Sequence, residues 1–393
     1  MKPTETVPCV QLHYRTTLPG VEKIETLDIE LTERCNLSCI HCYIRRAPND
    51  ALVAASEMST AKVCGVLSEA RALGCRTVRF TGGEPLLRRD FLAVYSHAHR
   101  IGLDISLATN ATLVTRRIAS ELGQRRPKSV SVSIYGWDEQ SYISTAQRSN
   151  AFRKFLRGLS LLRANDIPFR MRYPPLESLV ANSWRIRQLA AALGSQDAVP
   201  YAWELTLNAW HESSACDRLA QLRLSSEVAA RERLKEPGNA SYDLRLIMRG
   251  RSSGKYRKSL FNCPAAGRRP AVNAYGKLQV CLQVRHPETL YDLHDGTLSD
   301  AMQYHFPQMR ALIPSNERYV SRCLRCVLRP ACPQCPACSW MEHGTLDTPS
   351  AYYCAVMHAE GRLLGVLPPD KNGWDVDGDR NPERSPPEKR RPN

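Results

Sequence analysis

The sequence lacks the features that would assign it to a membrane or to an export pathway. No apolar run approaches the roughly 18 residues that a membrane-spanning helix needs, and the N-terminus, Met-Lys-Pro-Thr-Glu-Thr, lacks the apolar core of a signal peptide. The chain also has no long internal repeat and no long block of Lys and Arg before its C-terminal tail. These absences argue against a membrane protein and make the cytoplasm the expected location.

The sequence is short of acidic residues. Its 54 Lys and Arg residues against 39 Asp and Glu residues give a net charge of +15, and Arg greatly outnumbers Lys. Such a balance fits nucleic acid, a membrane surface or an acidic partner. Because the Arg residues are spread along the whole chain, we favour a solvated basic surface suited to an acidic peptide or carrier over nucleic acid. No His–Asp or Glu pair stands out as an acid/base couple.

Cysteine, by contrast, is abundant. Fifteen cysteines form an odd number and are too many for packing alone in a chain without a signal peptide. Clustered cysteines in a reducing compartment indicate metal binding rather than disulfides. Three lie in residues 35–42 and eight in residues 263–354. Cys64 and Cys75, within a helical pattern and beside a strand, are expected to be core thiols.

The first cysteine group has the spacing C-x3-C-x2-C, formed by Cys35, Cys39 and Cys42 after the apolar, strand-like residues 24–31. Three thiolates can hold three irons of a [4Fe–4S] cube and leave the fourth iron open to another ligand. A structural zinc site usually takes four protein ligands. The spacing therefore favours an iron–sulfur cluster, with a zinc site completed by a remote fourth ligand as the alternative.

Strand and helix patterns alternate six times along the first half of the chain. The expected strands are residues 24–31, 76–80, 103–108, 129–134, 167–172 and 199–207, and the expected helices are 59–73, 90–101, 115–122, 152–162 and 182–193, with a loop at 45–57. This alternation predicts an α/β fold with a parallel sheet, either open or curved into a partial (β/α)6 barrel. The site of such a fold lies at the C-terminal ends of its strands. Both the cysteine loop and the turn Gly82-Gly83-Glu84-Pro85 fall there.

The composition suggests four segments. We expect an N-terminal arm at 1–22, the partial barrel at 23–235, a small Cys-rich iron–sulfur domain at 236–366 and a polar, Pro-rich, disordered tail at 367–393. The tail assignment depends on the charged, Pro-containing sequence that follows Pro368.

With these motifs in place, the chain resembles a radical S-adenosylmethionine (SAM) enzyme over residues 23–212. Cys35, Cys39 and Cys42 match the family's C-x3-C-x2-C, and Gly82 to Pro85 match its GGEP motif. The resemblance implies that SAM chelates the open iron through its amino and carboxylate groups. An electron from the reduced cluster then splits the sulfonium C–S bond, and a 5′-deoxyadenosyl radical abstracts a substrate hydrogen.

Several residues carry further implied contacts to SAM. The carboxylate of Glu84 could accept a hydrogen bond from an ammonium group, although the GGEP sequence alone is also an ordinary strand-to-helix turn. His41 stands where the family usually has an aromatic residue near the adenine. Asn110 and Ser133 stand where it often contacts the ribose or the carboxylate, with strand-end capping as the alternative. Relatives often have Asp-Gly after the fourth strand, where this sequence has Tyr135-Gly136.

The C-terminal cysteines resemble a SPASM domain, which carries auxiliary clusters in peptide-modifying radical SAM enzymes. Cys263, Gly276 and Cys281 fit its C-x(9–15)-G-x4-C opening, and Cys323-x2-Cys326-x5-Cys332 fits the next part. The family then expects C-x3-C. In this sequence Pro336 stands where the second cysteine of C-x3-C is expected, and Cys335 and Cys338 lie on either side of it. Which of these two cysteines is the cluster ligand therefore stays open.

By family precedent the eight cysteines hold two auxiliary [4Fe–4S] clusters, which together need eight thiolates. The first would use Cys263, Cys281 and one or both of Cys335 and Cys338. The second would use four, namely Cys323, Cys326, Cys332 and Cys354. The competing interpretation is a zinc ribbon, with two C-x2-C knuckles at 323–326 and 335–338.

The leading functional hypothesis is radical modification of a ribosomal peptide by a crosslink, a thioether, an epimerised centre or an oxidation, with formylglycine formation as a subcase. The implied partners are a peptide or protein substrate, possibly with an acidic leader, and a reductase or flavodoxin-type electron donor. The arm at 1–22 is too short for the leader-binding domain of some maturases. A radical dehydrogenase or epimerase acting on a sugar or aminocyclitol is the alternative, and a zinc-binding nucleic-acid protein is a third interpretation.

Overall fold

The computed structural model describes residues 24–376 apart from 45, 196–197, 201–216, 218, 236–258, 262–267 and 333. The chain divides into two compact units. The first contains the described residues up to Leu224, with Ser259–Ile313 and Cys335–Leu346. The second contains the described residues of Ser225–Lys258, Pro314–Gln334 and those from Asp347 onward. The expected arm at 1–22 and Cys263 lie outside the described residues.

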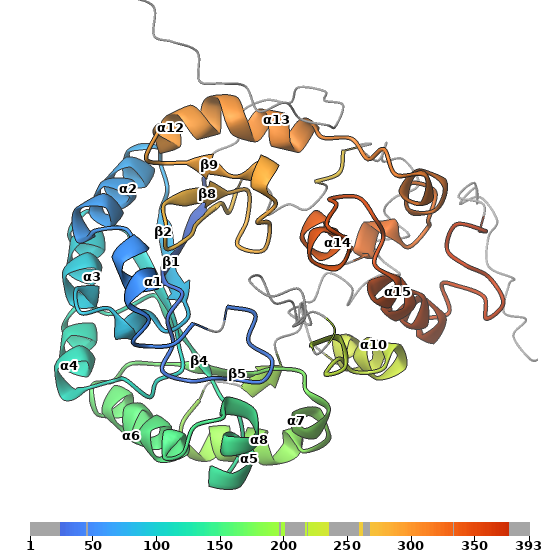
Figure 1. Ribbon diagram of the computed structural model, residues 1–393. Coiled ribbons are helices and arrows are strands. Elements are labelled where there is room, and N and C mark those ends of the chain that lie inside the picture. Colours follow the sequence, from blue (N-terminus) through green and yellow to red (C-terminus); the bar gives the residue numbers. More distant parts are fainter. Residues whose placement is uncertain are drawn as a thin grey trace, which may run out of the picture. The chain divides into compact units, whose positions relative to one another are not determined.

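A nine-stranded sheet forms the first unit and runs in the order β6-β5-β4-β3-β2-β1-β7-β8-β9 (Figure 1). Six parallel strands come first: β1 Thr26–Thr32, β2 Thr77–Gly82, β3 Asp104–Thr109, β4 Ser129–Ser133, β5 Arg170–Tyr173 and β6 Ala198–Pro200. The predicted α/β fold with a parallel sheet is confirmed. The remainder of the expected sixth strand lies outside the described residues.

The other edge of β1 carries an extension that periodicity does not predict. Strand β7 (Ala271–Val272) pairs in parallel with β1, and β8 (Lys277–Gln279) and β9 (Tyr291–Asp292) follow in antiparallel order. Strands of two or three residues are too short to show alternation. As a result, a segment expected in a separate C-terminal domain continues the sheet of the first unit.

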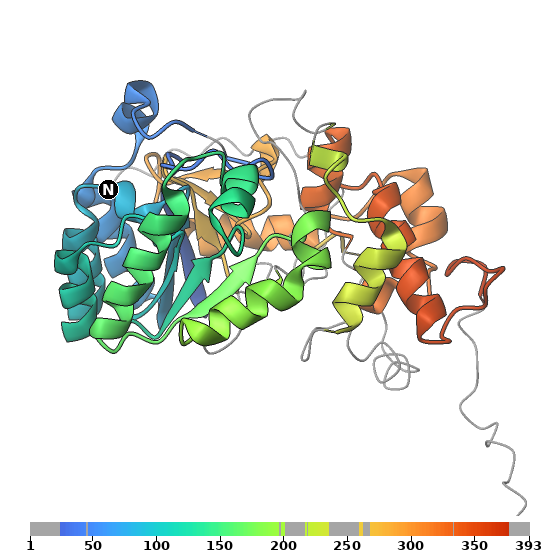
Figure 2. The ribbon, with the colours of Figure 1, turned by 90° about the horizontal axis from the view of Figure 1, so that it is seen from below.

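Helices connect the parallel strands, and most of them cover the outer face of the sheet, whereas the short helix at 51–56 stands clear of it (Figures 1 and 2). They are α1 Ala51–Ser56, α2 Thr60–Ala72, η1 Pro85–Leu87, α3 Phe91–Arg100, α4 Arg116–Gln124, α5 Glu139–Ala146, α6 Ala151–Ala164, α7 Glu177–Ala181 and α8 Ser183–Ala192. Side-chain caps begin two of these helices. The Ser59 hydroxyl accepts a hydrogen bond from Lys62 N before α2, and the Thr115 hydroxyl accepts one from Ile118 N before α4. The expected loop at 45–57 is wrong over α1, where Asp50 caps a short helix by accepting from Val53 N.

The two faces of β1 differ in chemistry. Leu27, Ile29 and Leu31 are fully buried on one face, whereas Asp28 and Glu30 are buried on the other. Parallel strands buried on both faces are normally apolar throughout. The inner face of this sheet therefore carries charged groups that need specific partners.

Further short elements complete the first unit: η2 Pro287–Thr289, α12 Leu298–Asp300, η3 Ala301–His305, α13 Phe306–Ala311 and α14 Pro336–His343. The second unit contains α10 Ser226–Leu234, η4 Tyr319–Cys323, η5 Arg329–Ala331 and α15 Ala351–Leu363. No helix among the described residues has the length and apolar character to cross a membrane.

The second unit has a small core of its own. Leu328, Ala331, Met357 and Leu367 pack together, and Val376 lies against them. Arg233 of α10 and Glu360 of α15 form a buried ion pair of 2.8 Å. The expectation of a disordered tail from residue 367 is therefore wrong for residues 367–376, because apolar side chains anchor that segment. The rest of the tail lies outside the described residues.

Two glycines in the interiors of helices test the packing of the first unit. Gly158 of α6 faces Ala111 O, which would lie 2.0 Å from a new Cβ, whereas Gly65 of α2 has open space around its position. We expect Gly65→Ala to stabilise the protein by about 0.5–1 kcal/mol through helix propensity. The Gly158→Ala variant should lose about 1–3 kcal/mol from overpacking. Denaturant unfolding followed by circular dichroism compares them, and equal stability of the two variants would contradict this packing.

Candidate functional site

The cysteine loop begins directly after β1 at the C-terminal edge of the sheet. Cys39 is buried, and Cys35 and Cys42 are half-buried. Burial, together with the charges of Glu84 and Cys42, raises the pKa of the Cys35 thiol to about 12. Burial likewise raises the pKa of the Cys39 thiol, with Cys42 and Cys35 adding to the effect. The three thiols thus lie within electrostatic reach of one another, and their thiolates need compensating positive charge.

The Gly82-Gly83 turn at the end of β2 packs directly against this loop. Gly83 N donates to Thr32 O (2.8 Å), and Glu84 N donates to Arg34 O (3.0 Å). A Cβ on Gly82 would lie 2.2 Å from Thr32 O, and one on Gly83 would lie 2.3 Å from Arg34 O. Side chains at these positions would push the two backbones apart. The two motifs, distant in sequence, therefore form one structural unit.

Glu84 is fully buried and uses both carboxylate oxygens. Oε1 accepts from Leu86 N (3.1 Å) and Thr109 Oγ1 (2.7 Å), and Oε2 accepts from Asn110 N (2.7 Å). Burial raises the Glu84 pKa to about 7, and these donors oppose the rise. The carboxylate therefore joins the ends of β2 and β3. Its expected contact with an ammonium group stays a prediction, as does the role of Pro85, which begins η1.

Asn110 points its side-chain amide at the cysteine loop. Nδ2 donates to Asn36 Oδ1 (3.1 Å) and lies 3.7 Å from Cys35 Sγ. Oδ1 accepts from Thr112 N (2.9 Å) and Thr112 Oγ1 (2.6 Å). The residue thus connects the end of β3 to the cysteine loop, which is more than strand-end capping.

Ser133 is the last residue of β4 and pairs in register with Arg172 of β5. Sequence reasoning missed Arg172, whose signal was the strand Arg170-Met171-Arg172-Tyr173. Met171 and Tyr173 are buried, so the two arginines alternate onto the other face. A cation and a hydroxyl therefore occupy adjacent positions near the cysteine loop's edge of the sheet.

The ring of His41 lies 5.6 Å from that of Tyr135, between ring centroids. Its Nδ1 is buried without a hydrogen-bond partner among the described residues. Burial lowers the His41 pKa to about 4, so the ring is neutral at neutral pH. Tyr135, which stands where relatives have Asp, also contacts the Tyr142 ring (5.7 Å). An aromatic wall thus borders the cysteine loop.

A buried ion network, which sequence reasoning missed, ties the cysteine loop to the extension of the sheet. Arg285 Nη1 donates to Glu33 Oε1 (2.6 Å), Arg285 Nη2 pairs with Glu30, and Tyr275 Oη donates to Glu33 Oε2 (2.8 Å). Burial raises the Glu30 pKa to about 7, and the charge of Arg285 opposes the rise. Arg285 follows Cys281 by four residues. The network therefore joins the two cysteine-bearing segments.

The described cysteines of the predicted auxiliary sets fall into the two units. Cys281, Cys335 and Cys338 belong to the first, where the Sγ atoms of Cys335 and Cys338 lie 3.6 Å apart. The second unit holds four, which influence one another electrostatically: Cys323, Cys326, Cys332 and Cys354. The assignment of these cysteines to two auxiliary clusters stays a prediction.

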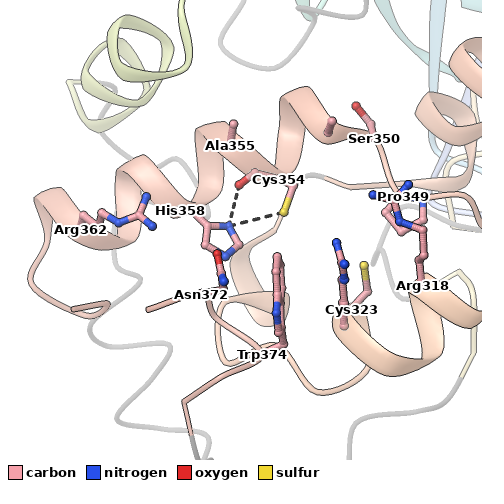
Figure 3. Close-up of a pocket in the computed structure, with 12 residues that line it drawn as sticks. Arg318, Cys323, Pro349, Ser350, Cys354, Ala355, His358, Arg362, Asn372 and Trp374 are labelled. Atoms are coloured by element: carbon pink, nitrogen blue, oxygen red, sulfur yellow. Dashed lines mark hydrogen bonds between the residues drawn. The ribbon is translucent and has the colours of Figure 1, made fainter. Parts of the chain in front are cut away.

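His358 supports Cys354 within the second unit (Figure 3). Gly373 N donates to its Nε2 (2.9 Å), so the ring proton of the neutral imidazole is on Nδ1. Nδ1 donates to Cys354 O (2.7 Å) and lies 3.5 Å from Cys354 Sγ. Outer hydrogen bonds of this kind orient metal ligands.

Among the described residues, no three His, Cys, Asp or Glu side chains converge closely enough to hold a single metal ion. Zinc bonds of about 2.3 Å would require such convergence. A cluster several atoms wide holds its thiolates further apart. The two kinds of site therefore require different thiolate spacings, and the assignment of the cysteine sets to iron–sulfur clusters stays a prediction.

Comparison with known proteins gives the following matches. Residues 29–176 match the model of the Radical SAM superfamily. The PqqA peptide cyclase of Bradyrhizobium diazoefficiens is 30% identical over 254 residues, covering 61% of this chain and 64% of that protein. The AdoMet-dependent heme synthase of Methanosarcina barkeri is 31% identical over 166 residues, covering 42% and 47%. The matches thus span about half to two thirds of these relatives' lengths.

Two solved structures share the fold. Streptococcus suis SuiB bound to S-adenosylmethionine has a TM-score of 0.62 at 13% identity, covering 84% of this chain and 77% of that chain. Native anSMEcpe with bound AdoMet has a TM-score of 0.59 at 15% identity, covering 87% and 98%. At these identities the likeness concerns the fold.

Substitution of Gly83 by Ala tests the contact between the two motifs. Its Cβ would meet Arg34 O and Glu33 O, at 2.3 and 2.6 Å. We expect displacement of the cysteine loop, so that iron bound after anaerobic reconstitution falls by about four per chain, one cluster's worth. Iron analysis and absorbance near 400 nm measure this, with Gly65→Ala as a folded control. Unchanged iron in Gly83→Ala would contradict the role of the contact.

Proposed function

We propose, on the premise that residues 29–176 form a radical SAM domain, that this chain modifies a peptide substrate by radical chemistry. The observation that carries the proposal is the backbone contact between the Gly82-Gly83 turn and the cysteine loop. It brings the expected cluster ligands and the expected SAM-binding turn together at one edge of the sheet. When bound, the cluster and SAM supply a 5′-deoxyadenosyl radical that removes a hydrogen atom from the substrate.

Different residues of the chain bind the cluster and the separate parts of SAM. Cys35, Cys39 and Cys42 hold the cluster, and Asn110 fixes Cys35 through its amide. The turn at 82–85 offers its backbone to SAM at a close approach that glycine permits. Ser133 and Arg172 provide a hydroxyl and a guanidinium for the SAM carboxylate. His41 offers its neutral ring to the adenine.

A peptide substrate is favoured by the eight cysteines of the C-terminal half and by the relatives. PqqA peptide cyclase is a peptide-modifying enzyme by name. SuiB has been solved with its precursor peptide SuiA, and anSMEcpe with peptides. We assign Cys323, Cys326, Cys332 and Cys354 to one auxiliary cluster. Cys263, Cys281 and one or both of Cys335 and Cys338 belong to the other.

A small-molecule substrate is the second candidate. The chain is also similar to an AdoMet-dependent heme synthase and to a probable GTP 3′,8-cyclase of Methanosarcina mazei, whose names do not indicate peptide substrates. Iron content separates the two candidates. The peptide proposal, with three clusters, requires about twelve irons per chain, and one auxiliary cluster would give about eight.

The Cys39→Ala variant tests the initiating site. We expect it to abolish reductive SAM cleavage and to lose about four irons per chain, because one of three cluster thiolates is missing. The matched control is Cys64→Ala, since Cys64 is a half-buried cysteine of α2 outside the assigned sets. 5′-Deoxyadenosine is quantified by chromatography. SAM cleavage at the wild-type rate in Cys39→Ala would contradict the assignment of Cys39 as a cluster ligand.

The substrate class is tested with precursor peptides encoded by neighbouring open reading frames. Incubation with SAM and a reductant should change one of them: a crosslink, a thioether or an oxidation changes the mass, the first two by the loss of hydrogen, and an epimerised centre changes the chromatographic retention at constant mass. The same peptide with Cys39→Ala should keep its mass and its retention. If no candidate peptide changes while the enzyme still cleaves SAM, the peptide proposal fails and the small-molecule candidate takes its place.

A further inference from the structure

A stack of three side chains, Trp137, Arg185 and Trp184, lies on the first unit and takes no part in the site described above. The guanidinium carbon of Arg185 lies 5.5 Å from the centroid of the Trp137 ring and 5.0 Å from that of the Trp184 ring. Trp184 is 59% exposed, and Arg185 is exposed as well. Because the two indoles orient the guanidinium, it loses less entropy when it binds a planar group.

The stack is short of hydrogen-bond acceptors. Within the described part of the chain, Arg185 forms no ion pair with a carboxylate, and the buried Nε1 of Trp137 has no acceptor. Asp138 lies within electrostatic reach of Arg185, but its carboxylate caps α5 by accepting from Ser141 N (2.8 Å) and Ser141 Oγ (2.7 Å). A guanidinium and an indole N–H in one stack form a donor set that suits a carboxylate.

The stack lies at the same edge of the sheet as the cysteine loop. Trp137 follows the carboxyl end of β4, and Arg185 stands in the first turn of α8, after the carboxyl end of β5. Helix α5 begins just after Trp137, and Ala146 O at its other end accepts from Ser38 N of the cysteine loop (3.1 Å). The eight residues of α5 span about 12 Å. An extended peptide covers that distance with about four residues.

We propose that this stack binds a carboxylate side chain of the substrate peptide, about four or more residues away from the residue that the radical attacks. The inference rests on the proposed function, because only a chain-like substrate reaches both places. Trp and Arg are the side chains that most often dominate the binding energy of protein interfaces. The exposed ring of Trp184 suits an apolar residue beside the carboxylate. A nucleic acid is less suited, since its phosphates require a row of cations and the stack offers one.

The test is the affinity of the reconstituted full chain, with SAM, for the precursor peptide that it modifies, measured by isothermal titration calorimetry. Arg185→Glu should weaken binding about tenfold or more, since a negative charge then faces the carboxylate. Arg185→Lys should weaken it about threefold, because the ammonium keeps the charge but loses the planar fork. Arg187→Glu is the matched control and should stay within about twofold, because Arg187 is exposed on the same helix but outside the stack.

Changes in the peptide supply the second half of the test. Its Asp and Glu residues are replaced one at a time by Asn and Gln. One replacement should weaken binding to the wild type about tenfold and have no such effect in Arg185→Glu, because non-additivity of this kind marks a direct pair. The KM for the peptide should rise in Arg185→Glu with kcat within about twofold, since the stack is remote from the reacting residue. Iron content equal to the wild type shows that this exposed substitution leaves the fold intact.

Equal affinity of Arg185→Glu and the wild type for the peptide would overturn the role of the stack and leave the proposed function intact. So would a loss of binding to fluorescein-labelled oligouridine RNA in that variant with peptide binding unchanged, which would assign the stack to nucleic acid. A wild-type chain that cleaves SAM but modifies no precursor peptide would overturn the proposed function and, with it, the peptide as the occupant of the stack.

Discussion

The close approach of two backbones, at Gly82-Gly83 and at residues 32–34, is the constraint on which the rest of the site depends. No side chain fits between the two segments, since a Cβ at either glycine would lie within 2.3 Å of a carbonyl oxygen. Main-chain contacts therefore place the cysteine loop. The Arg34–Glu57 ion pair (2.9 Å) and the bond from Cys35 N to Arg46 O (3.0 Å) hold the loop from its other side.

The same loop determines how the C-terminal segment joins the sheet. Glu30 and Glu33 are both buried and share Arg285 from the extension that carries Cys281. Removing one partner of a buried ion pair leaves an uncompensated charge and commonly costs about 3–5 kcal/mol. Together with the β1–β7 pairing, this ion network makes β1 and the Cys281 segment parts of one packed unit. That coupling explains why the compact units do not follow the order of the chain.

Sequence reasoning was most successful where the signal was local. Alternating apolar residues and caps such as Ser59 predicted the parallel strands and their helices, and C-x3-C-x2-C with GGEP predicted which residues meet. It failed for α1 and for β7 to β9, because short elements carry too little periodicity. It also missed the ion pairs of Arg285, and it did not predict that the Glu84 carboxylate accepts hydrogen bonds from Thr109 and Asn110. Such partners are set by the packing of distant segments, which no local pattern records.

Cys35 and Cys354 have charged neighbours of opposite sign. Near Cys35 the charge of Glu84 adds to burial in disfavouring the thiolate, whereas near Cys354 the charges of Arg322 and Arg318 oppose burial. Reduction potentials of iron–sulfur clusters follow net local charge and solvent exposure. Negative surroundings make the addition of an electron harder, and cations make it easier. By this argument the carboxylate near Cys35 would disfavour the reduction of a cluster bound there, whereas the arginines near Cys354 would favour the reduction of a cluster bound beside them.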